Sequence, residues 1–201
     1  MHLKTKKLTM NDSNILDKPV IHSEIVRKSM EIGFTMPSDV YIGTLLKTLV
    51  SSKPRGRFLE LGTGIGLSLS WMVDGLDDAS KVISVDNDEE LVSIASHYFG
   101  DDQRITLVCA DGTEWIRQYS GDSFDLIFAD AWPGKYSEID EILALVKVGG
   151  FYVIDDMTAQ PNWPEGHQAH VDSLIHYLEK RDDFNLTKLN WSTGLIIAVK
   201  K

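Results

Sequence analysis

Acidic side chains lie at or just past the ends of several short apolar segments that are typical of buried strands: Glu60, Asp86, Asp111, Asp130, Asp155 and Asp156. Carboxylates can accept hydrogen bonds from hydroxyl groups, bind a divalent cation or move a proton. The carboxyl ends of parallel strands meet at one edge of an open α/β sheet, where such sheets bind ligands. An acid at this point can instead cap the next helix. Because five predicted strands end alike, we interpret the edge as a binding site.

The first of these acids stands within the segment F-L-E-L-G-T-G-I-G-L-S at 58–68. Glycines at alternate positions let the backbone turn with positive φ and expose its N–H groups to a ligand at a helix N-terminus. Asp86 follows the next apolar segment, about 20 residues further on, where doubly wound folds bind the hydroxyls of a ribose. An ordinary turn between strand and helix could also be rich in glycine. The two features together indicate a cofactor that contains a nucleoside.

The spacing of the glycines separates two classes of cofactor. The dinucleotide fingerprint G-x-G-x-x-G needs a small residue at position 67, where this chain has Leu67. The pattern Glu60-x-Gly62-x-Gly64-x-Gly66 resembles motif I of class I S-adenosylmethionine-dependent methyltransferases. By similarity, the loop passes under the methionine half of S-adenosylmethionine. The residues that the resemblance assigns to the cofactor are Glu60, Gly62, Thr63, Gly64, Gly66, Ser68, Asp86, Asn87, Asp111, Gly112 and Asp130.

The resemblance also assigns parts of the cofactor to particular residues. Asp86 takes the ribose hydroxyls, Asp111 with Gly112 flanks the adenine, and Glu60 with Ser68 faces the amino-acid end.

Two further segments resemble the cation-dependent, catechol-type small-molecule O-methyltransferases: F-D-L-I-F-A-D-A-W-P-G-K-Y at 124–136 and V-I-D-D-M at 153–157. In that family an acid after the fourth strand and an acid-amide pair after the fifth strand hold one Mg²⁺. The matching positions are Asp130, Asp155 and Asp156, and oxygen ligands of this kind suit a hard cation. Asp130 and Lys135 are the catalytic candidates, with Lys135 as the general base.

This chain departs from the family at two positions. Asp156 stands where the family has asparagine, and Lys135 lies five positions after Asp130, whereas the family lysine lies three positions after its acid. An alternative to a metal site therefore stays open. In it, the three acids contact only the cofactor, the substrate and the ends of helices. His167 and His170 are a poor metal pair, because no further cysteine or histidine at ligand spacing accompanies them.

The elements that must position these residues alternate as in an α/β fold. Apolar segments predict strands at 57–61, 81–86, 105–109, 124–129 and 151–154, and a hairpin at 184–190 and 195–199. Helical spacing predicts helices at 66–76, 88–99, 113–119, 137–146 and 167–181. The fold class is thus a Rossmann-like, doubly wound, mostly parallel seven-stranded sheet that ends in an antiparallel hairpin.

Two amphipathic helices precede the first strand, one over 20–32 and one that opens at 37–39. They either pack on the sheet or form a lid over the cofactor, with Phe34, Met36 and Tyr41 as its apolar lining. The segment P-N-W-P-E-G at 161–166 overhangs the predicted site as a structural plug or a substrate gate. We expect one domain over 1–201, with a loose arm at 1–17, the helices at 18–53 and the core at 57–201.

Composition limits the possible partners. A net charge of −10 and a pI near 5.0 argue against nucleic acid, which requires clustered basic residues. Cys109 is the only cysteine, so no intrachain disulfide can form, and no apolar segment reaches the length of a membrane span. We therefore expect a cytoplasmic protein that acts on a small-molecule acceptor, and we leave open whether it forms a homodimer.

These features favour an enzyme that moves the methyl group of S-adenosylmethionine to an oxygen of a small acceptor. One alternative is an NAD(P)-dependent oxidoreductase, against which Leu67 argues. A second alternative is a module that binds the cofactor without catalysis, which is favoured only if both metal and base are absent.

Overall fold

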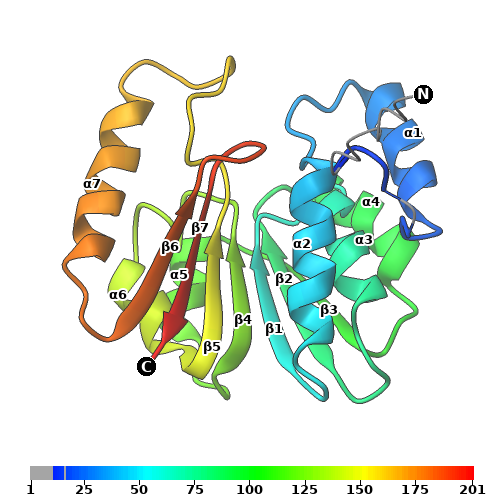
Figure 1. Ribbon diagram of the computed structural model, residues 1–201. Coiled ribbons are helices and arrows are strands. Elements are labelled where there is room, and N and C mark those ends of the chain that lie inside the picture. The colour runs from blue at the N-terminus through cyan, green and yellow to red at the C-terminus, as the bar shows by residue number, and fades with distance from the viewer. Residues whose placement is uncertain (1–10, 16) are drawn as a thin grey trace, which may run out of the picture.

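The computed structural model describes residues 11–15 and 17–201, so most of the expected arm lies outside the described residues. The strands are β1 (Arg57–Leu61), β2 (Lys81–Asp86), β3 (Ile105–Cys109), β4 (Phe124–Ala129), β5 (Val146–Ile154), β6 (Phe184–Leu189) and β7 (Leu195–Lys200). In the described part of the chain they form one seven-stranded sheet in the order β3-β2-β1-β4-β5-β7-β6 (Figure 1). Neighbouring strands among β1 to β5 pair in parallel, and β7 pairs antiparallel with both β5 and β6. The predicted fold class is confirmed.

Helices cover the two faces of the sheet in two groups. They are α1 (His22–Ile32), α2 (Val40–Ser51), α3 (Leu67–Asp74), α4 (Glu89–Phe99), α5 (Gly112–Gln118), α6 (Ile139–Ala144) and α7 (His167–Glu179). The first four share one apolar core through side chains such as Ile25, Leu46, Leu69 and Ala95. The last three share a second core, on the other face, through Ile116, Ile142 and Val171. None of the described helices is long and apolar enough to cross a membrane.

The predicted boundary between the sixth helix and the fifth strand is wrong. The helix ends at Ala144, and β5 begins at Val146, five residues before the expected start. Gly149 and Gly150 form part of this strand, where the register with β4 shifts. A Cβ at Gly150 would lie 2.8 Å from the carbonyl oxygen of Lys147, so only glycine fits this close approach. The glycines therefore mark an irregularity within the strand rather than a loop before it.

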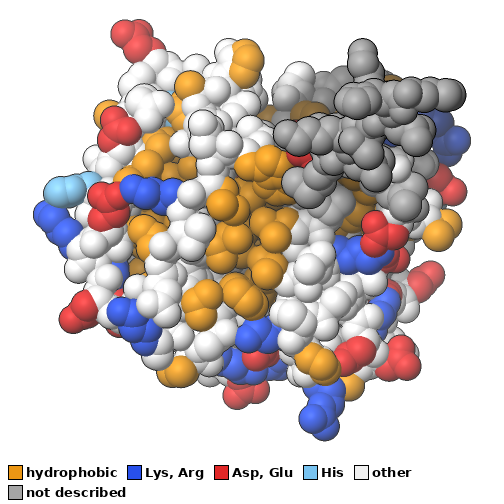
Figure 2. All heavy atoms as spheres, in the orientation of Figure 1, with side chains coloured by type: hydrophobic (Ala, Val, Ile, Leu, Met, Phe, Trp, Pro, Cys, Tyr) orange, Lys and Arg blue, Asp and Glu red, His pale blue; other side chains and the backbone are white. Residues whose placement is uncertain are grey.

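One half of the sheet carries an exposed apolar face. Phe151 on β5 pairs with Val199 on β7, and Val153 pairs with Ile197, so these side chains share one face. Phe151, Ile197 and Val199 are only half-buried, and Figure 1 shows no helix in front of β5 and β7. Figure 2 shows hydrophobic side chains gathered over the same central region. We call Phe151, Ile197 and Val199 the open sheet face.

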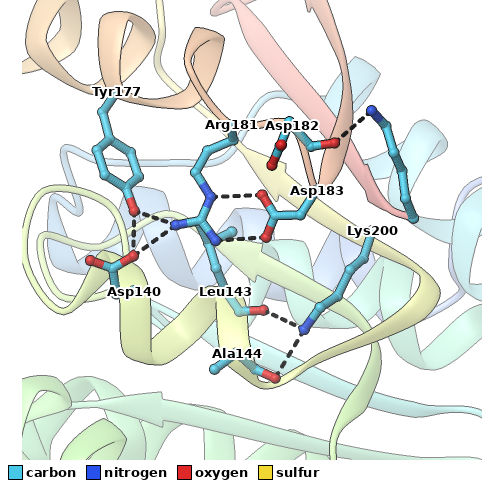
Figure 3. A network of polar contacts seen from close by, with 9 residues as sticks. Asp140, Leu143, Ala144, Tyr177, Arg181, Asp182, Asp183 and Lys200 are labelled. Atoms are coloured by element: carbon cyan, nitrogen blue, oxygen red, sulfur yellow. Dashed lines mark hydrogen bonds and ion pairs between the residues drawn. The ribbon is translucent and has the colours of Figure 1, made fainter.

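A polar network fixes the end of α7 against its neighbours (Figure 3). Arg181 donates to Asp140 on α6 at 2.8 Å, and also to both carboxylate oxygens of Asp183 at 2.8 and 2.7 Å. Lys200 donates to the carbonyl oxygens of Leu143 and Ala144, where the helix dipole of α6 favours a cation. These contacts are largely exposed and contribute little stability, but they join α6, α7 and the hairpin.

Candidate active site

A cavity of about 660 Å³ lies along the edge formed by the carboxyl ends of β1, β2, β4 and β5. This volume is typical of small-molecule sites. Its lining comes from the glycine loop, from the segments after β2, β4 and β5, from the α1–α2 connection and from the segment before α7. These residues include 34–39, 62–65, 86–88, 130–132, 135–136, 155–156 and 160–164. Phe34 and Met36 of the α1–α2 connection therefore line the cavity, as the lid hypothesis requires, whereas Tyr41 is not among the described residues that line it.

The glycine loop has the backbone that its sequence predicts. Gly62, Gly64 and Gly66 all have positive φ, at 100°, 50° and 92°. A Cβ at Gly62 would lie 2.7 Å from the carbonyl oxygen of Asp130, and one at Gly66 would lie 2.6 Å from the ring of Phe99. Gly62, Thr63 and Gly64 line the cavity, whereas Gly66 forms the N-cap of α3 beside it. The loop therefore presents backbone, free of bulky side chains, to the cavity.

Glu60 and Ser68 lie behind the loop and are not among the described residues that line the cavity. Glu60 is fully buried, and its two carboxylate oxygens accept hydrogen bonds from Ser68 at 2.7 Å and Ser84 at 2.5 Å. The hydroxyl of Thr63 shares a hydrogen bond of 2.5 Å with that of Ser84. Burial raises the pKa of Glu60 to about 7, although both hydroxyl donors oppose the rise. This network supports the loop from below.

Asp86 joins the end of β2 to the glycine loop and lines the cavity. One carboxylate oxygen accepts the backbone N–H of Gly64 at 2.8 Å, and the other accepts that of Asp88 at 3.0 Å. Asp88, not Asp86, is the N-cap of α4 and accepts from the backbone N–H groups of Glu90 and Leu91. A carboxylate can accept about four hydrogen bonds, so Asp86 keeps capacity for a ribose. Asn87 lines the cavity beside it.

Asp111 and Gly112 are placed differently from the other predicted cofactor residues. Asp111 is exposed and accepts the backbone N–H of Glu114 at 2.9 Å, which makes it the N-cap of α5. A Cβ on Gly112 would lie 3.0 Å from the ring of Pro133. Neither residue is among the described residues that line the cavity. The capping alternative therefore describes Asp111 in this structure, and its contact with adenine stays a prediction.

The remaining three acids meet at the far end of the cavity with one lysine. Asp130, Asp155, Asp156 and Lys135 all belong to the lining. Asp155 accepts hydrogen bonds from the Thr193 hydroxyl and from the backbone N–H of Asp156, the latter at 2.7 Å. Asp156 holds this position with a left-handed backbone, at φ 53°.

Burial dominates the electrostatics of this end. Desolvation and the neighbouring Asp155 raise the pKa of Asp130 well above its usual range, against the opposing charge of Lys135. Burial likewise raises the pKa of Asp155 to about 6, and it also raises the pKa of Asp156. It lowers the pKa of Lys135, which is only 5% exposed, although the three carboxylates oppose the change.

The described residues do not fit a divalent cation as they stand. Among them, no three acidic, histidine or cysteine side chains converge as a metal site. One oxygen of Asp155 already accepts two hydrogen bonds, and the buried ammonium of Lys135 shares the enclosure with the acids. A metal at Asp130, Asp155 and Asp156 therefore finds no support in their geometry.

An aromatic wall next to the acids was not predicted from the sequence. The hydroxyl of Tyr136 lies 3.0 Å from Nε2 of His167, and the ring centroids of Trp163 and His167 are 4.3 Å apart. Trp132 packs on His170 with centroids 4.8 Å apart. The proline-flanked Trp163 was the one sequence signal for this wall. Its partners come from the β4–α6 segment and the start of α7, which no spacing in the sequence connects.

A doubly wound sheet with a glycine loop after β1 and a strand-end acid after β2 defines a Rossmann-like fold for a nucleoside cofactor. The chain belongs to the O-methyltransferase family, because the family model described as O-methyltransferase matches residues 11–183. The resemblance to O-methyltransferases is thereby confirmed.

Individual relatives agree with this family. A protein from Mycobacterium ulcerans, provisionally named an O-methyltransferase, is 28% identical over 128 residues, or 61% of this chain and 56% of that protein. The chain thus matches little more than half the length of this curated relative. The O-methyltransferase from Bacillus cereus in complex with SAH has a TM-score of 0.80 at 19% identity, covering 94% of each chain. TomG from Streptomyces achromogenes, in complex with SAM, has a TM-score of 0.80 at 19% identity and covers 94% of this chain and 93% of its own. At these identities the two structures show a shared fold.

Proposed function

We propose that this protein is an S-adenosylmethionine-dependent methyltransferase that acts on an oxygen of a small molecule. The observation that carries the proposal is the continuous cavity between the glycine loop with Asp86 and the cluster of Asp130, Lys135 and Asp156. The first part suits the nucleoside and amino acid of the cofactor. The second part offers charged groups where a hydroxyl could be deprotonated. Membership in the O-methyltransferase family supports the same reaction.

The reaction depends mainly on the alignment of the acceptor oxygen, the methyl carbon and the sulfur. The acceptor oxygen attacks the sulfonium methyl group, an O–C bond forms, and the C–S bond breaks with its electron pair left on sulfur. The hydroxyl proton passes to a base, and the products are the methyl ether and S-adenosylhomocysteine. Because the sulfonium already activates the methyl group, holding oxygen, carbon and sulfur in line supplies most of the catalysis, about 7–11 kcal/mol in favourable cases.

Resemblance to the cation-dependent enzymes is the only support for Mg²⁺ as an additional cofactor. Since the carboxylates do not fit such an ion as they lie, we derive no step through it. The acceptor is a small molecule, because the net charge of −10 disfavours nucleic acid. The cytoplasmic location stays a prediction, as does the absence of a membrane partner.

Calorimetric titration tests the cofactor assignment. We expect S-adenosylmethionine and S-adenosylhomocysteine to bind and NAD not to bind, because the glycine loop followed by Leu67 suits no diphosphate. Binding of NAD without binding of either methionine nucleoside would support the oxidoreductase alternative. Binding of the nucleosides without methyl transfer to any hydroxylated acceptor would support the non-catalytic module.

A further inference from the structure

Lys135 is an unusual cation for its position. It is 5% exposed and lines the cavity, yet within the described part of the chain its ammonium forms no ion pair or hydrogen bond. Its Nζ atom lies 5.1 Å from the ring centroid of Tyr136, which offers a weak cation–π contact. A largely desolvated ammonium is costly unless anionic or polar oxygens lie near it, so an oxygen of a bound acceptor would stabilise it further.

The groups around Lys135 are mostly acidic. Asp130, Asp155 and Asp156 lie close enough to Lys135 for their charges to raise its pKa, and His167 acts in the same way on Asp156, whose pKa it lowers. The carboxylate of Asp130 accepts no hydrogen bond from a described residue, whereas Asp155 is held by Thr193 and the backbone. Whenever more than one of the three carboxyl groups is ionised, the single ammonium leaves the enclosure short of positive charge. The ammonium of Lys135 therefore occupies the position in which a metal cation would balance the negative charge of these acids.

We propose that Lys135 takes the place of a divalent cation in this protein, and that its ammonium binds the oxygen of the acceptor hydroxyl. The proposal rests on the proposed methyl transfer but makes a separate claim about the acids. Lys135 donates a hydrogen bond to the acceptor oxygen and keeps its own protons. The hydroxyl proton passes to one of the neighbouring carboxylates as the O–C bond forms and the C–S bond breaks. The ammonium stabilises the negative charge that develops on oxygen.

Binding of Mn²⁺, followed by electron paramagnetic resonance, tests this placement without any acceptor. We expect the wild-type protein to bind Mn²⁺ no better than Asp130→Asn does. Lys135→Met keeps the length of the apolar stem and removes the charge, so the three acids lose their compensating cation and can draw together around another one. We expect this variant to bind one Mn²⁺ at least about tenfold more tightly than the wild type, and Lys135→Met combined with Asp130→Asn to lose it.

Lys53→Met is the matched control. Lys53 donates to the carbonyl oxygen of Gly149 at 2.8 Å and is not among the residues that line the cavity, so its loss removes the same charge elsewhere. We expect it to behave as the wild type does. Stoichiometric binding of Mn²⁺ to the wild type that Asp130→Asn abolishes would overturn the proposal, even if Lys135→Met failed to fold. So would a folded Lys135→Met that gains no affinity for Mn²⁺.

Titration of the same variants with S-adenosylhomocysteine separates this proposal from the proposed function. Lys135→Met should bind that nucleoside as the wild type does, since the lysine lies at the acceptor end. If the wild type does not bind the nucleoside, the methyltransferase assignment is overturned. The Mn²⁺ result would then still show whether Lys135 balances the charge of the three acids, but it would say nothing about methyl transfer.

Discussion

Glu60 is the acid whose structure differs most from its predicted role. The resemblance placed it at the amino-acid end of the cofactor, and the structure places it beneath the loop with Ser68 and Ser84 as donors. A fully buried carboxyl loses its hydration, so its neutral form is favoured. It therefore links the stability of the glycine loop to pH.

Replacement of Glu60 by glutamine should change how stability depends on pH. The folded pKa of about 7 lies above the ordinary 4.5, so the folded protein binds the proton more tightly than the unfolded chain does. The corresponding stabilisation is complete below the ordinary pKa and is lost as pH rises through the folded pKa. Glu60→Gln cannot ionise, so its stability relative to the wild type should rise by about 3 kcal/mol between pH values of about 4.5 and 7.

Urea denaturation of both proteins across this range measures the difference. Glu24→Gln, at an exposed position on α1, is the control and should follow the wild type. Parallel curves for Glu60→Gln and the wild type would show that the carboxyl stays ionised in the folded protein.

Individual residues were predictable where backbone geometry restricts the amino acid. The glycines of the loop were identified because positive φ and close approach leave a recognisable pattern, and Asp86 was identified because it ends a strand. Thr193, which holds Asp155, could not be found in this way. Its contact joins positions far apart in the chain, and the hairpin turn around it predicts only a turn.

The junction of β2 and α4 separates a binding role from a capping role. Asp86 contacts the loop and the cavity, whereas Asp88 caps the helix. Asp86→Asn should weaken S-adenosylhomocysteine binding about ten- to a hundredfold, because a charge-assisted acceptor is lost. Asp88→Ala should instead lower the free energy of unfolding by about 0.5–2 kcal/mol and leave the affinity unchanged.

Calorimetry and denaturant midpoints on both variants decide between the roles. Because Asp86 also accepts two backbone N–H groups, Asp86→Asn is expected to lose some stability as well. Normal affinity of that variant for the nucleoside would argue against the ribose contact.

Elements were predictable where an apolar period of two or of 3.6 residues was uninterrupted. For the strands that are buried on both faces, the predicted first and last residues agree closely with the observed ones. The start of β5 was missed because two glycines interrupt its apolar run. From local sequence alone, glycine is interpreted as the end of an element. Pairing with β4 keeps this segment extended, and that pairing is a tertiary effect.

At the scale of the whole molecule, the open sheet face is where we expect contact if two copies of the chain pair, an oligomeric state that the sequence leaves open. Its half-buried side chains on β5 and β7 would be covered if a second copy packed there, and a stable interface needs about 800 Å² on each partner. Light scattering on the wild type should then give the mass of a dimer. Val199→Lys places a charge on this face and should give a monomer.

Val148→Lys is the control, because Val148 is 77% exposed yet lies outside the open sheet face. It should leave the mass unchanged. A wild-type protein that is monomeric at every concentration would contradict the homodimer.

The position of β7 bears on the order in which a growing chain can fold. β7 lies between β5 and β6, although it follows both in sequence, and β6 pairs only with β7 within the described sheet. Translation delivers the glycine loop and β1 to β5 first, while β6 must wait for the strand made after it. Thr193 lies in the turn just before β7, separated from it by Gly194, and donates to Asp155. A nascent chain can thus assemble the edge that carries the glycine loop well before Asp155 gains its contact with Thr193.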